Sequence, residues 1–317
     1  MPADLIAQFP KFESLSPLKT VADWIRFSAS QMERSGCFYG HGFGSPWQEA
    51  RFLTLRALQL DWNVPDSALA GQLLDSEREY LYQLIQQRCV AKIPSAYLLE
   101  EAWFFNEPFR VNSNVLVPRS PLAELISMAF EPWFSQPPQR VLDLCTGSGC
   151  IGIALARTFP DAQVDISDLS PEALQVATEN IGAKDLGYQV EAYLGDLYDG
   201  LGEHRYDLIV TNPPYVDLED ISDMPEEFSH EPRMGLVAGD DGLDLVRRIL
   251  GEAPEYLTEQ GWLVCEVGNS AVTLMDAFPE VNFEWPEFEM GGHGVFVISA
   301  EELKTHQQRF RASYAER

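Results

Sequence analysis

Basic residues are scarce in this chain. Its 317 residues include 22 Lys and Arg against 49 Asp and Glu, which gives a formal net charge of −27. Such an acidic chain repels phosphate backbones, and no cluster of Lys or Arg offsets the repulsion. We therefore expect no stable binding to nucleic acid, and either a basic protein or a small molecule as the partner. The alternative is that the charge only keeps the surface soluble.

Cysteines and long apolar runs are also few. The five cysteines are odd in number and form no CxxC pair, and neither they nor the five histidines show metal-ligand spacing. This pattern favours free thiols in a reducing cytosol, and it predicts no metal site. The stretch MPADLIAQFPKFESL lacks a basic region followed by an apolar one, and no apolar run approaches a membrane span. We expect a cytoplasmic protein without membrane contact.

The first part of the chain has the texture of a small helical domain, which we place at residues 1–92. One predicted helix carries a mostly apolar stripe along a single face: Val21, Trp24, Ile25, Ser28 and Met32. Residues 93–122 are instead rich in aromatic and β-branched side chains around the turn Asn106-Glu107-Pro108. This composition predicts a β-hairpin linker between two domains.

Residues 123–317 alternate between apolar runs and helical patterns, with a glycine turn after the first run. The apolar runs predict six strands: 140–145, 162–168, 188–196, 206–212, 261–267 and 294–299. Helical patterns follow the first two strands, at 150–159 and 170–183. This alternation predicts an α/β domain, with a Rossmann-like parallel sheet and helices on both faces.

The glycine turn is the first chemical motif. Gly147 and Gly149 lie where a strand passes into a helix, so a ligand can approach the backbone N–H groups closely. Asp168 ends the second strand, where a carboxylate can accept hydrogen bonds from ribose hydroxyls. With Gly152 the motif also matches the G-x-G-x-x-G of dinucleotide-binding dehydrogenases. Asp143 argues against that reading, because an acid before the turn suits a cationic amino group. A purely structural turn is the remaining alternative.

The second chemical motif is the tetrapeptide Asn212-Pro213-Pro214-Tyr215, which ends a predicted buried strand. The prolines stop the strand and stiffen the turn, since proline has no N–H for a sheet ladder. The Asn212 side-chain oxygen and the Pro213 carbonyl could each accept one N–H of a planar NH2 group, and Tyr215 could pack on that group. The alternative is an ordinary turn after a strand.

Residues 141–156, 168–174 and 207–216 resemble S-adenosylmethionine-dependent methyltransferases with a Rossmann-like sheet. The tetrapeptide resembles the motif of those members that methylate planar nitrogens, either adenine amines or glutamine amides. The resemblance implies S-adenosylmethionine as the cofactor. It also implies a set of cofactor-binding residues: Asp143, Thr146, Gly147, Ser148, Gly149, Asp168, Leu169, Asp196, Leu197 and Asn212.

Further segments resemble protein-glutamine N5-methyltransferases: 109–121, 231–250, 261–270 and 287–299. Members of this family methylate a glutamine in release factors or in a large-subunit ribosomal protein. The release-factor type usually has Arg-Pro-Glu-Thr where this chain has Arg119-Ser120-Pro121, and a glycine where it has Cys145. The ending EFEMGGHGVFV resembles the ribosomal-protein type. We therefore expect methylation of a ribosomal-protein glutamine, with release factors and adenine N6 as the alternative substrates.

Seven acids follow the tetrapeptide within residues 217–231, where there is no Lys or Arg: Asp217, Glu219, Asp220, Asp223, Glu226, Glu227 and Glu231. Such a loop would attract a basic ribosomal protein. It could equally be a solvated surface loop. The helical domain is the expected recognition surface, because the tetrapeptide recognises only a planar amide. Arg119 is open to two readings, a contact with cofactor or substrate and a structural ion pair.

Overall fold

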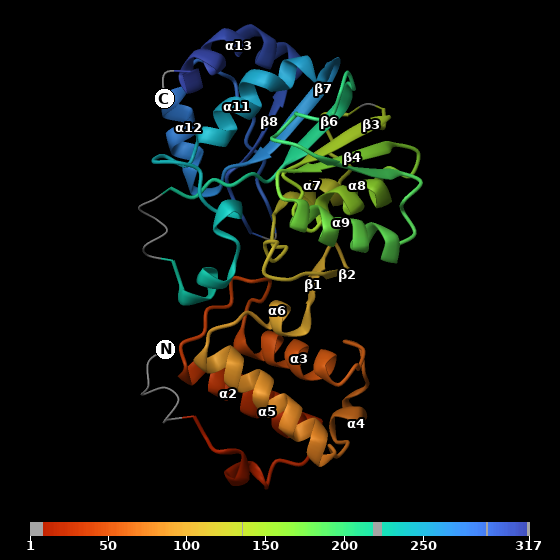
Figure 1. The fold of residues 1–317 in the computed structure, drawn as a ribbon, viewed down its shortest axis with the longest axis vertical. Coiled ribbons are helices and arrows are strands. Elements are labelled where there is room, and N and C mark those ends of the chain that lie inside the picture. The colour runs from red at the N-terminus through yellow and green to blue at the C-terminus, as the bar shows by residue number, and fades with distance from the viewer. Residues whose placement is uncertain (1–8, 135, 218–223, 290, 316–317) are drawn as a thin grey trace. The chain divides into compact units, whose positions relative to one another are not determined.

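The computed structural model describes residues 9–134, 136–217, 224–289 and 291–315 (Figure 1). The chain divides into two compact units. The helical unit comprises Met1–Ala102 and Pro225–His230, and the sheet unit comprises Trp103–Met224 and Glu231–Arg317. A short stretch of the helical unit is therefore inserted, in sequence, between two parts of the sheet unit.

The helical unit is built around three longer helices and several short ones. Its elements are η1 Phe12–Leu15, α2 Val21–Arg34, α3 Pro46–Ala57, α4 Asp66–Leu69, α5 Asp75–Val90, α6 Ser95–Leu99 and η2 Glu226–His230. The predicted stripe on α2 is confirmed, since all five of its residues are buried. The four apolar ones share one core with residues of α3 and α5, such as Leu53 and Ile85. Helical periodicity therefore dictates this unit's core.

A β-hairpin follows, as the sequence predicts. Its strands are β1 Glu101–Phe104 and β2 Glu107–Arg110, which form a two-stranded sheet. The connecting residues Phe105 and Asn106 have φ angles of +49° and +60°. Two successive positive φ angles are typical of a two-residue hairpin turn whose twist matches that of the strands.

The sheet unit contains six strands in the order β5-β4-β3-β6-β7-β8. They are β3 Arg140–Leu144, β4 Gln163–Asp168, β5 Val190–Leu194, β6 Tyr206–Thr211, β7 Leu257–Glu266 and β8 Val295–Ser299. All six predicted strands are confirmed. The expected all-parallel arrangement is wrong at β8, which pairs antiparallel with β7. An antiparallel strand is common at the edge of an otherwise parallel sheet.

Helices cover both faces of this sheet, as predicted. The helices are α7 Leu122–Ser127, α8 Cys150–Thr158, α9 Pro171–Ala183, α11 Asp244–Glu252, α12 Ala271–Ala277 and α13 Ala300–Ala315, with short turns η3 Arg233–Gly235, η4 Ala253–Glu255 and η5 Gly268–Ser270. Val141 packs into the core formed with α7, α8 and α9, whereas the next residue, Leu142, packs into the core formed with α11, α12 and α13. This alternation along β3 places one core on each face of the sheet. Figure 1 shows the helices that cover the two faces.

The strand order reverses at β3, which lies between β4 and β6. The chain proceeds from β3 to β4 and β5 on one side and then starts again with β6 on the other. In open parallel sheets, ligands bind outside the carboxyl ends of the strands at such a reversal.

All five cysteines are free. In the part of the chain that the structure describes, no helix is long and apolar enough to cross a membrane.

Candidate active site

The glycine turn joins β3 to α8 at the point where the strand order reverses. Gly147 and Gly149 have φ angles of +56° and +79°, a region that favours glycine. A Cβ atom on Gly149 would also lie 3.1 Å from the Cβ atom of Ala177. The N–H of Thr146 donates to the Ser167 carbonyl on the neighbouring strand at 3.0 Å. The backbone path therefore requires glycine and is fixed to β4.

Asp143 lies directly beneath this turn and is fully buried. Its Oδ2 atom accepts hydrogen bonds from the Gly152 N–H at 2.8 Å and from the Thr146 hydroxyl. Its Oδ1 atom has no hydrogen-bond partner among the described residues. Burial raises the pKa of Asp143 to about 7, against the opposing effect of these two hydrogen bonds. A buried carboxylate oxygen without a partner fits the cationic amino group of S-adenosylmethionine.

Asp168 connects the end of β4 to the glycine turn. Its Oδ2 atom accepts from the Gly147 N–H at 2.8 Å, and its Oδ1 atom accepts from the Ser170 N–H at 2.9 Å. Burial raises the pKa of Asp168, and these backbone N–H groups oppose the rise. A carboxylate offers about four acceptor positions, so ribose hydroxyls could still bind to it. The structural role of Asp168 in the turn was not foreseen from the sequence.

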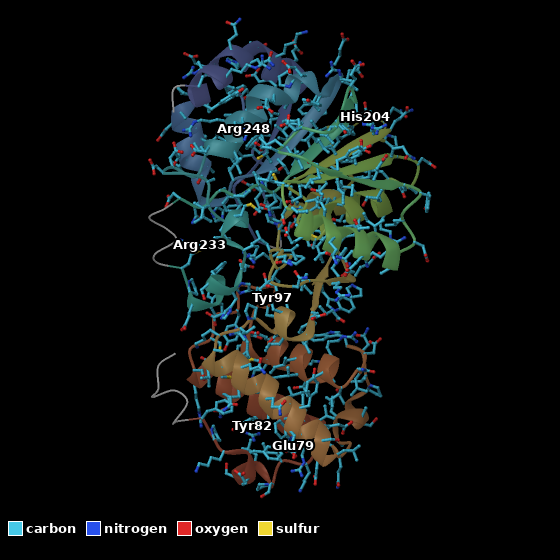
Figure 2. The ribbon with its side chains drawn as sticks, viewed as in Figure 1. Glu79, Tyr82, Tyr97, His204, Arg233 and Arg248 are labelled. Atoms are coloured by element: carbon cyan, nitrogen blue, oxygen red, sulfur yellow. The ribbon has the colours of Figure 1, made fainter. Side chains whose placement is uncertain are left out.

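The other expected cofactor residues have different surroundings. Ser148 is buried in the turn, while the side chain of Leu169 is 55% exposed beside Asp168. Asp196 forms an ion pair with Arg248 of α11 at 3.1 Å, and Figure 2 labels Arg248. The side chain of Leu197 is buried in the sheet unit's core. The structure thus gathers residues 143–149 and 168–169 around one turn, whereas the side chains of Asp196 and Leu197 have other partners.

The tetrapeptide follows β6, the strand next to β3. The Thr211 hydroxyl donates to the Leu144 carbonyl at 2.7 Å, so the ends of the two strands are joined beside the glycine turn. Asn212 is partly exposed, and its side chain makes no hydrogen bond with the described residues. Pro213 is buried and Pro214 partly buried. The amide of Asn212 is therefore presented on a stiff turn at the same edge of the sheet.

Tyr215 is held from several directions. Its hydroxyl donates to Oε1 of Glu266 at 2.8 Å, and its carbonyl accepts from the Ser270 hydroxyl at 2.9 Å. Space around it depends on two glycines: a Cβ atom on Gly268 would lie 2.5 Å from the tyrosine ring, and one on Gly242 would lie 2.4 Å from the tyrosine carbonyl. A larger residue at Gly268 would displace the ring, and one at Gly242 would displace the backbone of Tyr215.

Glu266 is a site residue that the sequence analysis missed. It is buried at the end of β7 and accepts hydrogen bonds from Tyr215 and from the Ser120 hydroxyl. Burial raises the pKa of Glu266, and both hydroxyl donors oppose the rise. The sequence offered one signal for Glu266: it is an acid at the end of a predicted buried strand, as Asp168 is. Ser120 lies in the very tripeptide that departs from the release-factor pattern.

Arg119 forms the ion pair that one of its two readings expects, since its Nη2 atom lies 2.7 Å from Oε2 of Glu231. Glu227 is likewise paired, with Arg88 at 2.9 Å. Two of the seven acids expected at the surface are therefore buried in ion pairs. That part of the acidic-loop expectation is wrong, because Arg88 and Arg119 from other parts of the chain neutralise these two carboxylates and allow them to be buried. Three further acids, Glu219, Asp220 and Asp223, lie outside the described residues.

Comparison with known proteins agrees with this geometry. Residues 127–282 match the family model described as methyltransferase small domain. A ribosomal protein uL3 glutamine methyltransferase from Francisella tularensis subsp. tularensis is 41% identical over 309 residues, which cover 97% of this chain and 98% of that protein. A protein of the same name from Xanthomonas campestris pv. campestris is 44% identical over 293 residues, covering 92% and 95%. The chain belongs to the ribosomal protein uL3 glutamine methyltransferase family.

This family membership confirms the predicted fold class and the prediction of a methyltransferase. It also confirms the resemblance to the ribosomal-protein type over the release-factor type. Among solved structures, the hMettl16 catalytic domain in complex with MAT2A 3'UTR hairpin 6 matches with a TM-score of 0.48 and 16% identity, covering 72% of this chain and 83% of that one. A similarity of that size carries no argument about function.

Proposed function

We propose that this methyltransferase transfers a methyl group from S-adenosylmethionine to the side-chain amide nitrogen, N5, of a glutamine in ribosomal protein uL3. The observation that carries the proposal is the hydrogen bond from the Thr211 hydroxyl to the Leu144 carbonyl, at 2.7 Å. It joins the end of β6, which leads into the tetrapeptide, to the end of β3, which leads into the glycine turn. It brings an amide-binding turn next to a turn suited to the cofactor. The names of the two relatives support the choice of substrate.

The residues around the glycine turn fit the cofactor. Asp143 has a buried oxygen available for the amino group, and Asp168 has acceptor positions left for the ribose hydroxyls. Leu169 presents an exposed apolar side chain beside Asp168, suited to the adenine ring. When bound, S-adenosylmethionine supplies an electrophilic methyl group on a sulfonium.

The tetrapeptide addresses the weakness of an amide as a nucleophile. The lone pair of an amide nitrogen is delocalised into its carbonyl, so the nitrogen must be oriented and its developing positive charge stabilised. The Asn212 side-chain oxygen and the Pro213 carbonyl would accept hydrogen bonds from the two N–H groups. These hydrogen bonds would orient the nitrogen and stabilise its developing positive charge. Tyr215 would pack on the planar group. Its hydroxyl is bonded to Glu266, so it is not assigned the role of a base, and the proton can leave to water after transfer.

Two substrates compete with this proposal, adenine in nucleic acid and glutamine in release factors. An adenine methyltransferase that acts on a duplex needs a basic groove to hold the strand. A chain with a net charge of −27 is poorly suited to form such a groove. Radiolabelled methyl transfer into a cell lysate, followed by protease or nuclease, separates protein from nucleic acid. We expect label that protease removes, because the proposed substrate is a protein. The ribosomal-protein substrate also supports our proposal that the enzyme acts in the cytoplasm. Label removed only by nuclease contradicts the proposal.

A further inference from the structure

Residues 225–231, which we call the tether, follow the tetrapeptide by ten positions and carry two buried glutamates. Glu227 belongs to the helical unit and Glu231 to the sheet unit. Each is paired with an arginine of its own unit, Glu227 with Arg88 and Glu231 with Arg119. A single short segment therefore has one ionic anchor in each unit.

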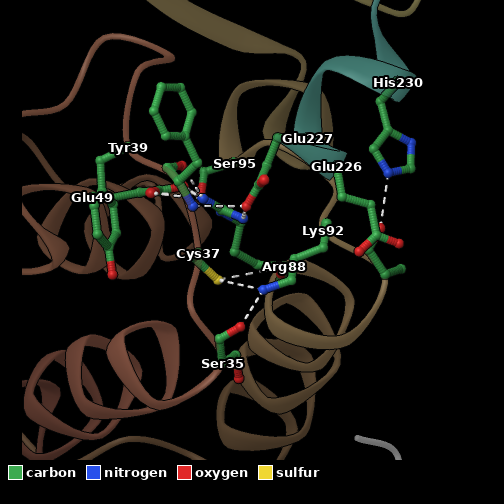
Figure 3. Close-up of polar contacts among 12 residues, drawn as sticks. Ser35, Cys37, Tyr39, Glu49, Arg88, Lys92, Ser95, Glu226, Glu227 and His230 are labelled. Carbon is green, nitrogen blue, oxygen red and sulfur yellow. Dashed lines mark hydrogen bonds and ion pairs between the residues drawn. The ribbon is translucent and has the colours of Figure 1, made fainter. Parts of the chain in front are cut away.

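The anchor in the helical unit is buried, and Figure 3 shows its polar contacts. Arg88 is 1% exposed; its Nε atom lies 2.5 Å from Glu49 and its Nη1 atom 2.9 Å from Glu227. Its Nη2 atom donates to the Phe38 carbonyl at 2.7 Å, while the Phe38 N–H donates to Glu227 at 2.8 Å. Ser95 donates to Glu49 at 2.7 Å. Every charged group in this cluster thus has several partners.

Neighbouring side chains reinforce this anchor. The Nε2 atom of His230 lies 2.8 Å from the Ala91 carbonyl (Figure 3). The Phe228 ring lies 5.6 Å from the Phe38 ring and 4.8 Å from the His41 ring, measured between centroids. The tether is therefore packed into the helical unit as one of its own elements, although the chain on both sides belongs to the other unit.

The anchor in the sheet unit leads to the candidate active site. The side chain of Glu231 is completely buried against Arg119. The residue after Arg119 is Ser120, whose hydroxyl donates to Glu266. Glu266 in turn accepts the hydrogen bond of Tyr215. Three side-chain contacts and one peptide bond thus connect Glu231 to the tetrapeptide.

Stability alone is a weak reason for two buried ion pairs, since apolar residues of similar volume often stabilise a protein at least as well. We propose that Glu227 and Glu231 are positioning residues with separate tasks in uL3 methylation, an inference that rests on the proposed function. Glu227 holds the tether in the unit expected to recognise the protein substrate. Glu231 holds Arg119 and, through Ser120, the tyrosine of the tetrapeptide. Loss of the first weakens substrate binding, and loss of the second slows turnover.

The test compares steady-state kinetics on purified uL3. Glu227→Ala should raise KM for uL3 about tenfold and leave kcat within about twofold. Glu227→Gln should have a smaller effect, because its amide oxygen can still accept from Arg88 and Phe38. Glu231→Gln should lower kcat about fivefold with little change in KM. Glu79→Ala, an exposed acid on the helix that carries Arg88 (Figure 2), is the matched control and should change neither.

Calorimetric affinity for S-adenosylmethionine should be the same in all four variants, and thermal melting identifies any that fails to fold. If Glu227→Ala unfolds, the KM of Glu227→Gln for uL3 decides the test. In that variant Arg88 keeps Glu49 as a charged partner and the new amide oxygen as an acceptor. The inference is overturned if the Glu227 variants behave like the control, or if the Glu227 and Glu231 variants change the same kinetic parameter. A wild-type protein that leaves uL3 unmethylated contradicts the proposed function and, with it, this inference.

Discussion

The hydroxyl of Tyr215 donates a hydrogen bond to Oε1 of Glu266 across 2.8 Å. Burial raises the pKa of both groups, and the charge of Glu266 raises that of the phenol further. At neutral pH the phenol is therefore neutral and remains the donor. The bond fixes the ring beside the Asn212 turn and makes Tyr215 a positioning group.

Removing this hydroxyl should affect stability more than chemistry. Tyr215→Phe keeps the ring and leaves Glu266 with Ser120 as a donor. We expect it to lower the free energy of unfolding by about 1.5–3 kcal/mol, the usual contribution of a hydrogen bond to a charged group. Turnover should fall less than about tenfold in Tyr215→Phe and far more in Tyr215→Ala. Equal losses of turnover in the two variants would show that the ring has no role in the reaction.

Asn212 should behave in the opposite way. Its side chain makes no hydrogen bond with the described residues and is partly exposed, so Asn212→Ala should leave the melting temperature nearly unchanged. Turnover should fall by about a hundredfold or more, as for loss of one transition-state hydrogen-bond partner. A variant that melts early but whose folded fraction methylates normally would contradict the assigned role.

Asp168 should matter for both folding and cofactor binding. Asp168→Ala removes the acceptor for the Gly147 and Ser170 N–H groups as well as the contact proposed for ribose. We expect affinity for S-adenosylmethionine to fall about ten- to a hundredfold. Calorimetry with S-adenosylmethionine and with NAD provides the measurement. Tight binding of NAD alone would favour the dehydrogenase reading of the glycine motif.

The raised pKa of Asp143 leads us to expect that cofactor binding depends on pH. Its folded-state pKa of about 7 exceeds the ordinary value of 3.8. In the unliganded protein, stability should therefore decrease as pH rises through the window between these values. A cationic amino group binds the ionised carboxylate, so affinity should rise about fivefold from pH 6 to pH 7, where the amino group itself stays largely protonated. Asp143→Asn should abolish this slope in calorimetric titrations; a slope that persists would assign it elsewhere, for example to Asp168.

Much of the fold follows from local sequence. The six strands, the α2 stripe and the hairpin were predictable because periodicity and turn chemistry act over a few residues. The direction of β8 was not, since it depends on the path of the chain after β7. Gly147, Asp168 and the tetrapeptide could be recognised because each lies at the end of a strand. The fold then brings these ends together at one edge of the sheet.

The partners of the site's charged groups could not be predicted in this way. Glu266 and Tyr215 are 51 residues apart in sequence, and Arg88 and Glu227 are 139 apart. A single sequence does not show which distant residues will meet, because such pairs form only when the helices and strands pack together. The sequence analysis placed Glu227 in an acidic surface loop and made no prediction for Arg88, and most charged residues are exposed. Their burial is a finding of the structure.

Methylation of purified uL3 and purified release factor, side by side with S-adenosylmethionine and followed by mass spectrometry, tests the central claim most directly. We expect one added methyl group on a glutamine side chain of uL3 and none on the release factor. Changing that glutamine to alanine should abolish the modification, and Asn212→Ala in the enzyme should nearly do so. Methylation of the release factor alone, or of uL3 at a residue other than glutamine, would contradict the proposed function.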